Sequence, residues 1–307
     1  MEKNGEYIKT IAEVRSISLA AEKLGISQPA LSSFLKKKES EIGAVLFDRS
    51  KQPLELTEAG SVYLDYLDRM SILKNEMSQN IADIEGMKTG HLAIGGASFF
   101  NIVYLPKAVG RFMEKYPGIN IEIIDGKVPE LVTAAQKGTL DLFITPFADE
   151  EERFFYEELL EETIYICVPS DWAVNRELSG KTQSGEPLTA KEFKRLCEHT
   201  FVTLKPDQHI GQKLEALFEK YNCRPVHTVL AEQTMTTLAL TMSGVGVSLI
   251  AESSIRNSNI AEKPALYLAD PEICTRKIYI SYPRNKYLSK AAEEFIEILK
   301  TANRQVD

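Results

Sequence analysis

The first sixty residues carry apolar side chains at three-to-four-residue spacing, which predicts three short helices. Their inward positions are Tyr7, Ile8, Ile11 and Ala12 in the first, Ala20, Ala21 and Leu24 in the second, and Leu31, Phe34 and Leu35 in the third. Ser18 and Ser27 are placed to cap the second and third helices, and Gly25 is a stop signal between them. Two short helices joined by a glycine turn are typical of the helix-turn-helix, whose second helix enters the DNA major groove.

A ribbon and a long helix follow these three helices. Residues 48–56 predict a short two-stranded wing with Pro53 at its bend, and an uninterrupted helix is predicted from Thr57 to about Ile84. Its apolar residues form a near-heptad seam of Tyr63, Tyr66, Met70, Leu73, Met77, Ile81 and Ile84. Such a seam most often pairs with an equal helix in a dimer, and packing along its own domain is the alternative. Residues 85–90 are expected to form a linker.

From His91 onward, short apolar strands alternate with amphipathic helices. Strands are predicted at 92–95, 119–124, 140–145, 163–169, 201–204, 226–230, 247–250 and 278–282. Helices are predicted at 103–116, 129–137, 210–221, 234–242 and 289–301, and residues 189–192 form a capping box that opens another. This alternation implies parallel sheets covered by helices. Residues 91–307 are enough for two similar α/β lobes with a cleft between them.

Charge is spread unevenly along the chain. The net charge is -8, but residues 1–60 hold nine basic and nine acidic side chains, so the whole acidic excess lies beyond them. Lys36, Lys37 and Lys38 form a local basic cluster, and phosphates respond to local charge rather than to the whole-chain balance. The polar start of the chain lacks a signal-peptide core, and no apolar run reaches the ~18 residues of a membrane span, so a cytoplasmic protein is expected.

The residues that could carry metal or redox chemistry are scattered. The four cysteines form no CxxC pair (Cys167, Cys197, Cys223, Cys274), and the four histidines do not cluster. Isolated buried thiols in a reducing cytoplasm are the expectation, and a redox-sensing pair is the alternative. The sequence therefore predicts no metal, no cofactor and no catalytic centre.

The motifs along the chain resemble those of the LysR-type transcriptional regulators. In the first domain these are SISLAAEKLGISQPALS, ESEIGAVLFDRS and LELTEAG. Later landmarks are GHLAIGGAS, YLPKAVGRFMEKYPGINIEI, GTLDLFI and MSGVGVSLIAES. The resemblance covers nearly the whole chain. Lys38 departs from it by standing where the family usually has leucine, and its long side chain is expected to snorkel outward.

The resemblance implies a multidomain α/β protein of three parts. These are an N-terminal winged helix-turn-helix (1–57), a long linker and dimerisation helix with a hinge (58–90), and a two-lobed effector-binding domain of the periplasmic-binding-protein type (91–307). Lobe I would comprise 91–162 and 269–307, and lobe II 163–268. The implied protein is a DNA-binding regulator whose DNA binding is modulated by a small anionic metabolite bound between the lobes. The family usually acts as activator and autorepressor, as a homodimer or homotetramer, with RNA polymerase as a further partner.

The candidate DNA-binding residues lie on the third helix and the wing. Gln28, at the helix start, suits an adenine edge, and Pro29 can face a thymine methyl group. The remaining candidates would contact phosphates, bases or the minor groove: Ser27, Ser32, Ser33, Lys36, Arg49, Lys51 and Gln52. A solvated helix face is the alternative for each serine taken alone.

The candidate effector-binding residues stand at predicted strand ends and helix starts. Ser98 follows a strand and opens a helix, where an anion is favoured, and in similar regulators this residue contacts the effector. Lys127 falls where the family often lines its cleft. Thr145, Pro146, Thr203, Gln233 and Thr234 complete the set. Two rival functions remain open: a sensor whose N-terminal module binds protein rather than DNA, and an enzyme built on the α/β lobes.

Overall fold

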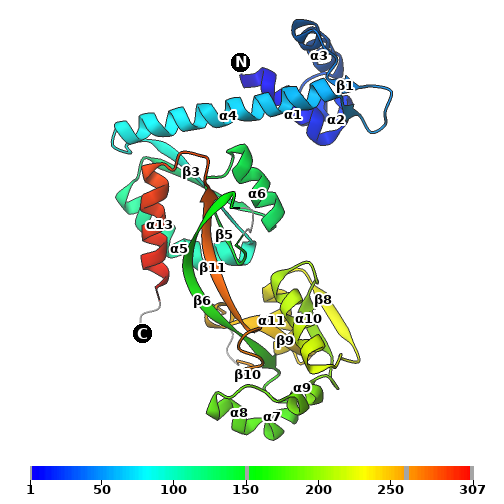
Figure 1. Ribbon diagram of the computed structural model, residues 1–307, viewed down its shortest axis with the longest axis vertical. Coiled ribbons are helices and arrows are strands. Elements are labelled where there is room, and N and C mark those ends of the chain that lie inside the picture. Colours follow the sequence, from blue (N-terminus) through cyan, green and yellow to red (C-terminus); the bar gives the residue numbers. More distant parts are fainter. Residues whose placement is uncertain (1, 149–151, 259–262, 305–307) are drawn as a thin grey trace. The chain divides into compact units, whose positions relative to one another are not determined.

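The computed structural model describes residues 2–148, 152–258 and 263–304 (Figure 1). Backbone contacts divide the chain into two units, residues 1–78 and 79–307. The boundary falls inside one long helix that begins in the first unit and ends in the second.

The first unit is a small helical domain with a two-stranded ribbon. Its elements are α1 (Glu2–Val14), α2 (Ile17–Lys23), α3 (Gln28–Ile42), β1 (Phe47–Asp48), β2 (Glu55–Leu56) and the start of α4 (Glu58–Ile84). One core joins them, made of Ile8, Ile11, Ala20, Ala21, Leu31, Leu35, Leu46 and Phe47. β1 and β2 pair antiparallel. The predicted three helices, wing and long helix are confirmed.

The helix caps agree with the sequence at one position and differ at the other. Ser27 has extended backbone and its hydroxyl accepts from the Ala30 N–H, as predicted. The cap of α2, however, is Ser16, whose hydroxyl accepts from the Leu19 N–H at 3.4 Å, so the assignment of Ser18 is wrong. Both serines precede an apolar residue, and the sequence pattern does not distinguish them.

Gly60 lets α4 start close to the core of the first unit. A Cβ atom placed on Gly60 would lie 2.0 Å from the Leu46 carbonyl oxygen, which no side chain tolerates. Thr57 organises the same junction, because its hydroxyl donates to the Val45 carbonyl at 2.6 Å and accepts from the Gly60 N–H at 2.9 Å. The threonine and glycine of the LELTEAG motif therefore fix the entry into α4.

The second unit is built on two sheets that share one strand. The first has the order β4-β3-β5-β11-β6, and the second continues β6-β9-β7-β8 with β10 also on β6. The first-sheet strands are β3 (Gly90–Gly96), β4 (Ile119–Asp125), β5 (Leu142–Thr145), β6 (Phe154–Val168) and β11 (Thr275–Pro283). The second adds β7 (Phe201–Leu204), β8 (Thr228–Ala231), β9 (Val247–Ala251) and β10 (Ala265–Tyr267). β3 pairs parallel with β4 and β5, and β7 pairs parallel with β8 and β9, as predicted. β6, β10 and β11 pair antiparallel with their neighbours, so the prediction of parallel sheets is wrong for these three strands.

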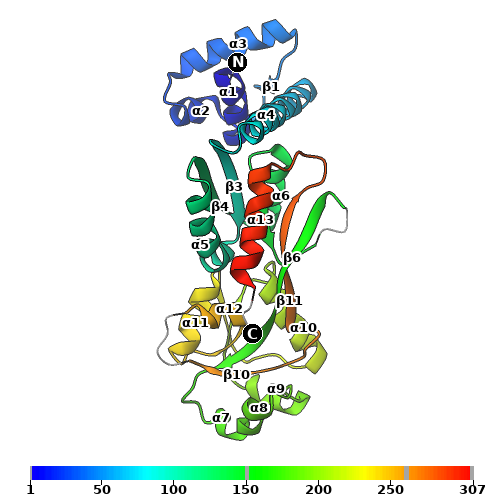
Figure 2. The same ribbon diagram turned by 90° about the vertical axis from the view of Figure 1, so that its left-hand side faces the viewer.

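Helices cover both faces of the first sheet. Leu92 and Ile94 of β3 point to α5 (Ser98–Lys115) and α13 (Lys290–Asn303), which lie together in Figure 2 and meet through Phe112 and Phe295 at 5.4 Å. Ala93 points to the opposite face, where α6 (Val128–Lys137) packs. This strict alternation is that of a strand buried on both sides.

The second sheet is covered in the same way. Ile164, Ile166 and Val168 of β6 face a core shared with α9 (Ala190–Leu196) and α10 (His209–Tyr221). Cys167 faces the other side, with α11 (Thr234–Met242) and α12 (Glu252–Arg256). The short helices α7 (Val174–Glu177) and α8 (Ser179–Ser184) complete this half. The two-lobed α/β architecture is confirmed.

Two elements begin five or more residues before their predicted starts. α5 begins at Ser98 rather than 103, and β6 begins at Phe154 rather than 163. The added part of β6 is acidic, and distant lysines compensate it: Glu157 and Glu158 pair with Lys300 and Lys277. Such pairing across the fold leaves no apolar signal in the local sequence. Among the described helices, none combines the length and apolarity that crossing a membrane requires.

Candidate functional site

The predicted DNA-binding residues form the outer surface of α3 and the wing. Eight of the nine are exposed, and the ninth, Ser32, is half-buried. They fall on the first turns of α3 (Ser27, Gln28, Pro29, Ser32, Ser33, Lys36) and on the ribbon (Arg49, Lys51, Gln52). None of them belongs to the core beneath, which is supplied by Leu31 and Leu35. The amino end of α3 is therefore open at the surface of its unit.

Gln28 leads this surface. Its Nε2 donates to Ser32 Oγ one turn later at 3.0 Å, and both side chains lie on the outer face of α3. The bond leaves the Gln28 carbonyl oxygen free to accept and keeps the amide extended along the helix. Pro29 occupies the first helical turn, where its missing N–H carries no cost.

Glu39 fixes Arg49 beside α3. One Glu39 carboxylate oxygen accepts from the Leu46 N–H at 2.9 Å, and the other accepts from Arg49 Nη2 at 3.0 Å. The Glu39 side chain is nearly buried, whereas Arg49 remains exposed. This arrangement ties the wing arginine to α3 while its guanidinium keeps further donors for a phosphate.

The three lysines on α3 have different roles. Lys38 reaches Glu41 at 2.6 Å, and this hydrogen bond raises the lysine pKa and lowers that of the Glu41 carboxyl. Lys38 thus turns its charged end away from the core, as expected from snorkelling. Lys36 and Lys37 are exposed, and Lys36 lies on the same side of α3 as Ser32 and Ser33 by helical spacing.

A second candidate site lies where strands of the two lobes end opposite each other. Lys127, the N-cap of α6, reaches Asp207 of the other lobe at 3.7 Å. Phe147, two residues beyond β5, meets His209 at the start of α10 edge-on, with ring centroids 5.0 Å apart. These contacts confirm that the carboxyl ends of β4 and β5 face the start of α10.

Ser98 stands at the amino end of α5, and a carboxylate of the chain itself already lies there. Ser98 Oγ donates to Asp125 Oδ2 at 2.9 Å, and Asn101 Nδ2 donates to Asp125 Oδ1 at 2.6 Å. Asp125 ends β4, so the end of this strand meets the start of α5. The Asp125 carboxylate thus occupies the predicted anion position at this helix start.

The remaining predicted effector residues are divided between surface and interior. Thr145 is buried, and its hydroxyl accepts from the Phe147 N–H at 3.2 Å. Thr203 and Thr234 are also buried. Pro146 is half-buried, and Gln233 is exposed as the N-cap of α11. The threonines therefore support the strand and helix ends, whereas Gln233 and Lys127 offer accessible polar groups.

His209 is held neutral beside this site. Burial, and to a smaller extent the positive charges of Arg276 and Lys213, together lower its pKa to about 3. Its Nδ1 atom is buried and has no hydrogen-bond partner among the described residues, and the same holds for Asn101 Oδ1. A buried polar atom without a partner costs free energy unless water or a ligand satisfies it.

Comparison with known protein families identifies both parts of the chain. Residues 4–61 match the bacterial regulatory helix-turn-helix domain of the LysR family, and residues 85–304 match the LysR substrate-binding domain. The chain belongs to the LysR family of transcriptional regulators. The predicted family, the fold class and the exclusion of an enzyme are confirmed by this assignment.

Relatives match along most of their length. The HTH-type transcriptional regulator YybE of Bacillus subtilis (strain 168) is 25% identical over 94% of this chain and 94% of its own. A RuBisCO operon transcriptional regulator of Allochromatium vinosum is 26% identical over 95% of this chain and 92% of its own. The crystal structure of full-length CbnR with its target DNA superposes with a TM-score of 0.64 at 21% identity, covering 98% of this chain and 99% of that one. The last likeness shows a shared fold.

This LysR regulator also has a polar cluster that the sequence did not indicate. Glu162 of β6 accepts from Arg276 Nε of β11 at 2.8 Å, from the Ser253 N–H of α12 at 3.0 Å and from Tyr104 Oη of α5 at 3.2 Å. All four residues are buried. Burial, followed by the charge of Glu162, raises the Tyr104 pKa. The partners are far apart in sequence, so no local motif could have indicated the cluster.

Potential metal ligands do not gather in this LysR protein. Within the described ranges, no group of three or more histidine, cysteine, aspartate or glutamate side chains is placed to hold a metal ion. Cys197 and Cys223, however, lie in contact, so the expectation of isolated thiols is wrong for these two.

Proposed function

We propose that this LysR regulator binds double-stranded DNA by placing the amino end of α3 in the major groove. The observation that carries the proposal is the exposed Gln28, held along α3 by its hydrogen bond to Ser32 at 3.0 Å. The amide of a glutamine can contact adenine N6 and N7 together. Ser27, Pro29, Ser32 and Ser33 are small enough for a close approach of the duplex.

The surrounding cations would orient the domain on the duplex. Lys36, Arg49 and Lys51 are exposed around α3 and the wing, and Gln52 at the wing tip would reach the minor groove. Phosphate contacts supply affinity but little sequence information, whereas Gln28 and its neighbours would supply preference.

A gel-shift assay on the DNA upstream of the coding region tests this step. The expected result is binding that weakens steeply between about 50 and 200 mM salt, because each phosphate contact releases counterions. No shift at any salt concentration would favour the rival function, a sensor whose N-terminal module binds protein. A DNA fragment of the same length and scrambled sequence serves as the control, because it distinguishes sequence preference from general affinity for DNA.

We further propose that a small anionic metabolite binds between the lobes and modulates DNA binding. Lys127 offers an exposed ammonium group there, and Ser98 offers a hydroxyl and a helix start. The ligand would displace Asp207 from Lys127 and Asp125 from Ser98. Exposed ion pairs such as Lys127–Asp207 contribute little to stability, so exchanging their anion costs little. The buried atoms Asn101 Oδ1 and His209 Nδ1 add polar positions that a ligand or its water could satisfy.

The effector acts through the arrangement of the lobes. A ligand shifts an equilibrium only by its difference in affinity for the two arrangements, and that difference is what alters DNA binding. A thermal-shift screen of small carboxylates, sulfur compounds and amino acids would identify candidates. Ser98→Ala is expected to weaken the response to such an effector and leave basal DNA binding intact. Unchanged induction in this variant would contradict the assignment of Ser98.

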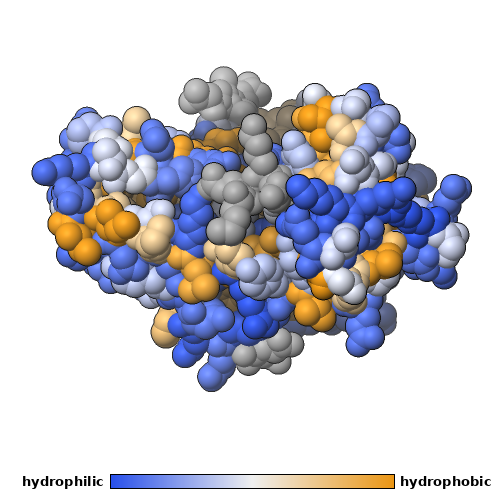
Figure 3. Space-filling view, turned by 90° about the horizontal axis from the view of Figure 1, so that it is seen from above, coloured by the Kyte–Doolittle hydropathy of each residue, from blue (hydrophilic) through white to orange (hydrophobic). Residues whose placement is uncertain are grey.

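The exposed seam of α4 supports assembly as a homodimer, or as a homotetramer formed from two dimers. Its outward residues are Tyr66, Met70, Leu73, Met77, Ile81 and Ile84. Orange hydrophobic surface among hydrophilic residues is visible in Figure 3. A dimer would present two copies of α3 to two half-sites, as repeated helix-turn-helix domains require. The expected regulation is activation together with autorepression, with RNA polymerase as a partner of the DNA-bound protein in the cytoplasm.

A further inference from the structure

Two cysteines of lobe II lie in direct contact although they stand far apart in the sequence. Cys197 is the C-cap of α9, and Cys223 follows the last turn of α10. Their Sγ atoms are 2.8 Å apart, and both thiols are free. A disulfide bond is about 2.05 Å long, so bonding requires an approach of less than about 1 Å.

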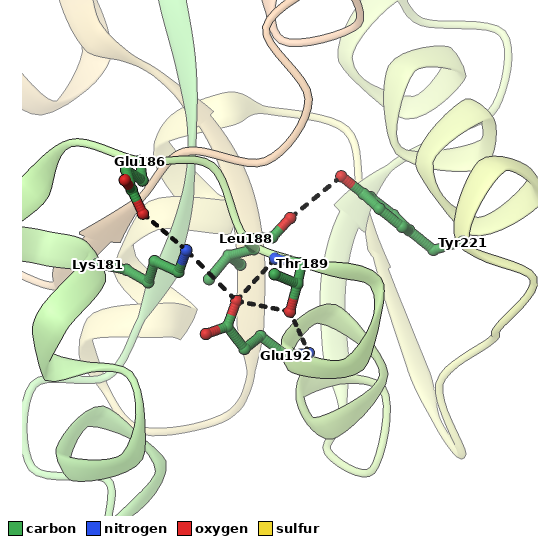
Figure 4. Close-up of polar contacts among 6 residues, drawn as sticks. All are labelled: Lys181, Glu186, Leu188, Thr189, Glu192 and Tyr221. Atoms are coloured by element: carbon green, nitrogen blue, oxygen red, sulfur yellow. Dashed lines mark hydrogen bonds and ion pairs between the residues drawn. The ribbon is translucent and has the colours of Figure 1, made fainter.

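The start of α9 is fixed by polar contacts that also reach α10 (Figure 4). Glu192 and Thr189 form a reciprocal capping box at the start of α9, and Lys181 lies 4.0 Å from the same glutamate. Tyr221 Oη donates to the Leu188 carbonyl just before α9, at 3.4 Å. The Phe193 ring of α9 lies 4.7 Å from the Tyr221 ring of α10. The thiols therefore meet because two packed helices hold them, and not because two loops happen to be close.

The two thiols differ in exposure. Cys197 is 5% exposed and belongs to the lobe II core, whereas Cys223 is half-buried at its margin. Burial raises the pKa of the Cys197 thiol, and the neighbouring Cys223 sulfur raises it further. A small dissolved disulfide therefore reaches Cys223 first. Cys197 lies next to it on the buried side and can displace the small thiol that becomes attached to Cys223.

We propose that Cys197 and Cys223 form a reversible disulfide when the protein meets a low-molecular-weight disulfide. The Cys223 thiolate attacks one sulfur of that disulfide, which breaks its S–S bond and releases one small thiolate. Cys197 then loses its proton and attacks Cys223 Sγ, which releases the second small thiolate and forms the protein disulfide. In balance, two protein thiols are oxidised and one small disulfide is reduced to two small thiols.

The bond would join α9 to the carboxyl end of α10. It closes a loop between residues 26 positions apart, so it restricts the unfolded chain. The opposite end of α10 begins at His209, which contacts Phe147 of lobe I. Oxidation therefore fixes one end of the helix whose other end lies at the candidate effector site.

Thiol counting on the full-length protein tests the proposal directly. The protein is equilibrated in oxidised and reduced glutathione under native conditions, quenched with acid, alkylated in denaturant so that buried thiols also react, and examined by mass spectrometry with peptide mapping. We expect all four cysteines to be alkylated in the reduced form and only Cys167 and Cys274 in the oxidised form, with one peptide linking 197 to 223. Dithiothreitol should restore all four. Four free thiols throughout, stable glutathione adducts without the link, or a link between other cysteines would overturn the proposal.

Stability and fluorescence provide two independent readouts. The disulfide should raise the melting temperature by roughly 5–10 °C relative to the reduced protein. The single tryptophan, Trp172, lies against His199 with the ring centroids 4.7 Å apart, and His199 is two residues beyond Cys197. Its emission is therefore expected to change with oxidation and to return on reduction.

Matched variants separate the pair from the other thiols. Cys223→Ser should abolish the melting shift and the fluorescence change, and Cys197→Ala should do the same. Cys167→Ala and Cys274→Ala remove buried thiols outside the pair and should retain both responses. A full oxidative shift in Cys223→Ser, a conservative change at a half-buried position, would refute the pair even if Cys197→Ala fails to fold.

Discussion

At the scale of single residues, we expect DNA preference to depend on Gln28. Its side chain is exposed at the first position of α3, and its only described hydrogen bond runs to Ser32 on the same outer face. The Gln28 side chain therefore contributes nothing to the packing of the core. Replacing it should alter DNA recognition without unfolding the domain.

Gln28→Ala is expected to lower the preference for the specific site by ~1–3 kcal/mol while leaving affinity for random DNA nearly unchanged. The measurement is the ratio of dissociation constants for the upstream site and a scrambled duplex at one salt concentration. Lys36→Ala is the matched control, because a lost phosphate contact should weaken both duplexes equally and reduce the salt dependence. Equal losses on both duplexes in Gln28→Ala would contradict a base-reading role.

His209 should make folding stability depend on pH. Its folded pKa of about 3 lies below the ordinary value of 6.5, because the ring is buried and near cations. The unfolded chain therefore binds a proton below about pH 6.5 that the folded chain refuses. The free energy of unfolding should fall by roughly 1–2 kcal/mol from this residue between pH 7 and 5.

Urea denaturation at several pH values measures this dependence. His209→Gln should flatten the profile between pH 7 and 5, because glutamine does not titrate in that range. His227→Gln is the control, since its side chain is exposed and lies outside the candidate site. An unchanged slope in His209→Gln would show that other groups cause the acid sensitivity.

At the scale of elements, α4 combines a fixed start with an open apolar seam. Leu73 is 65% exposed and Met77 is 56% exposed. Apolar residues at this spacing on a long helix are costly to leave in water unless a second helix covers them.

Leu73→Asp should therefore shift the protein toward monomers, because it places a charge in the centre of the proposed helix pair. Sedimentation velocity across a concentration series measures the change. Ser78→Asp introduces the same side chain at an exposed position of α4 outside the seam and should leave assembly unchanged. Dimers of wild-type strength in Leu73→Asp would assign the seam a different role.

Position 60, in the first turn of α4, has no room for a side chain. Gly60→Ala would place its Cβ against the Leu46 carbonyl, a backbone atom that cannot rotate away. We expect a loss of about 1–3 kcal/mol in stability, of the size seen when well-packed sites are overfilled. Thermal unfolding of the variant measures this. Gly110→Ala, in a helix with open space around the added Cβ, should be neutral or stabilising.

Local sequence predicted most elements because their signals are local. The cap at Ser27, the stop at Gly25 and the strand at Phe201–Leu204 each depend on residues within one turn or one strand. The start of β6 was missed because its glutamates are compensated by lysines from β11 and α13. The same reason hid the contact of Cys197 with Cys223, which depends on two helices packing.

In the candidate sites, too, the features with a local sequence signal could be predicted, and those that depend on distant residues could not. The DNA-binding face follows from helical spacing, so exposure could be inferred before the structure was known. At the effector site, the strand ends could be located, but Asp125 could not be placed against Ser98, because that contact needs the register of two strands. The contribution of His209 also depends on cations that come from distant segments.

At the scale of the whole molecule, two long strands connect the lobes, and a buried ion pair lies between them. β6 and β11 run side by side through the second unit (Figure 1), and Glu162 on one meets Arg276 on the other at 2.6 Å. Tyr104 of α5 and the Ser253 N–H of α12 complete the shell around the carboxylate. The Glu162 carboxylate is thus bound by elements of both lobes.

Removing one residue of the Glu162–Arg276 ion pair should therefore lower the stability of both lobes together. Arg276→Met would leave Glu162 charged and buried without its cation, and such losses cost about 3–5 kcal/mol. Glu162→Leu would leave Arg276 uncompensated in the same way. The double variant Glu162→Leu/Arg276→Met removes both charges and should recover most of the loss, because two apolar side chains leave no buried charge to compensate. Urea denaturation of the single and double variants forms a cycle that isolates the pair. If the single variants each lose less than about 1 kcal/mol, or if their losses simply add in the double variant, the ion pair does not hold the lobes together.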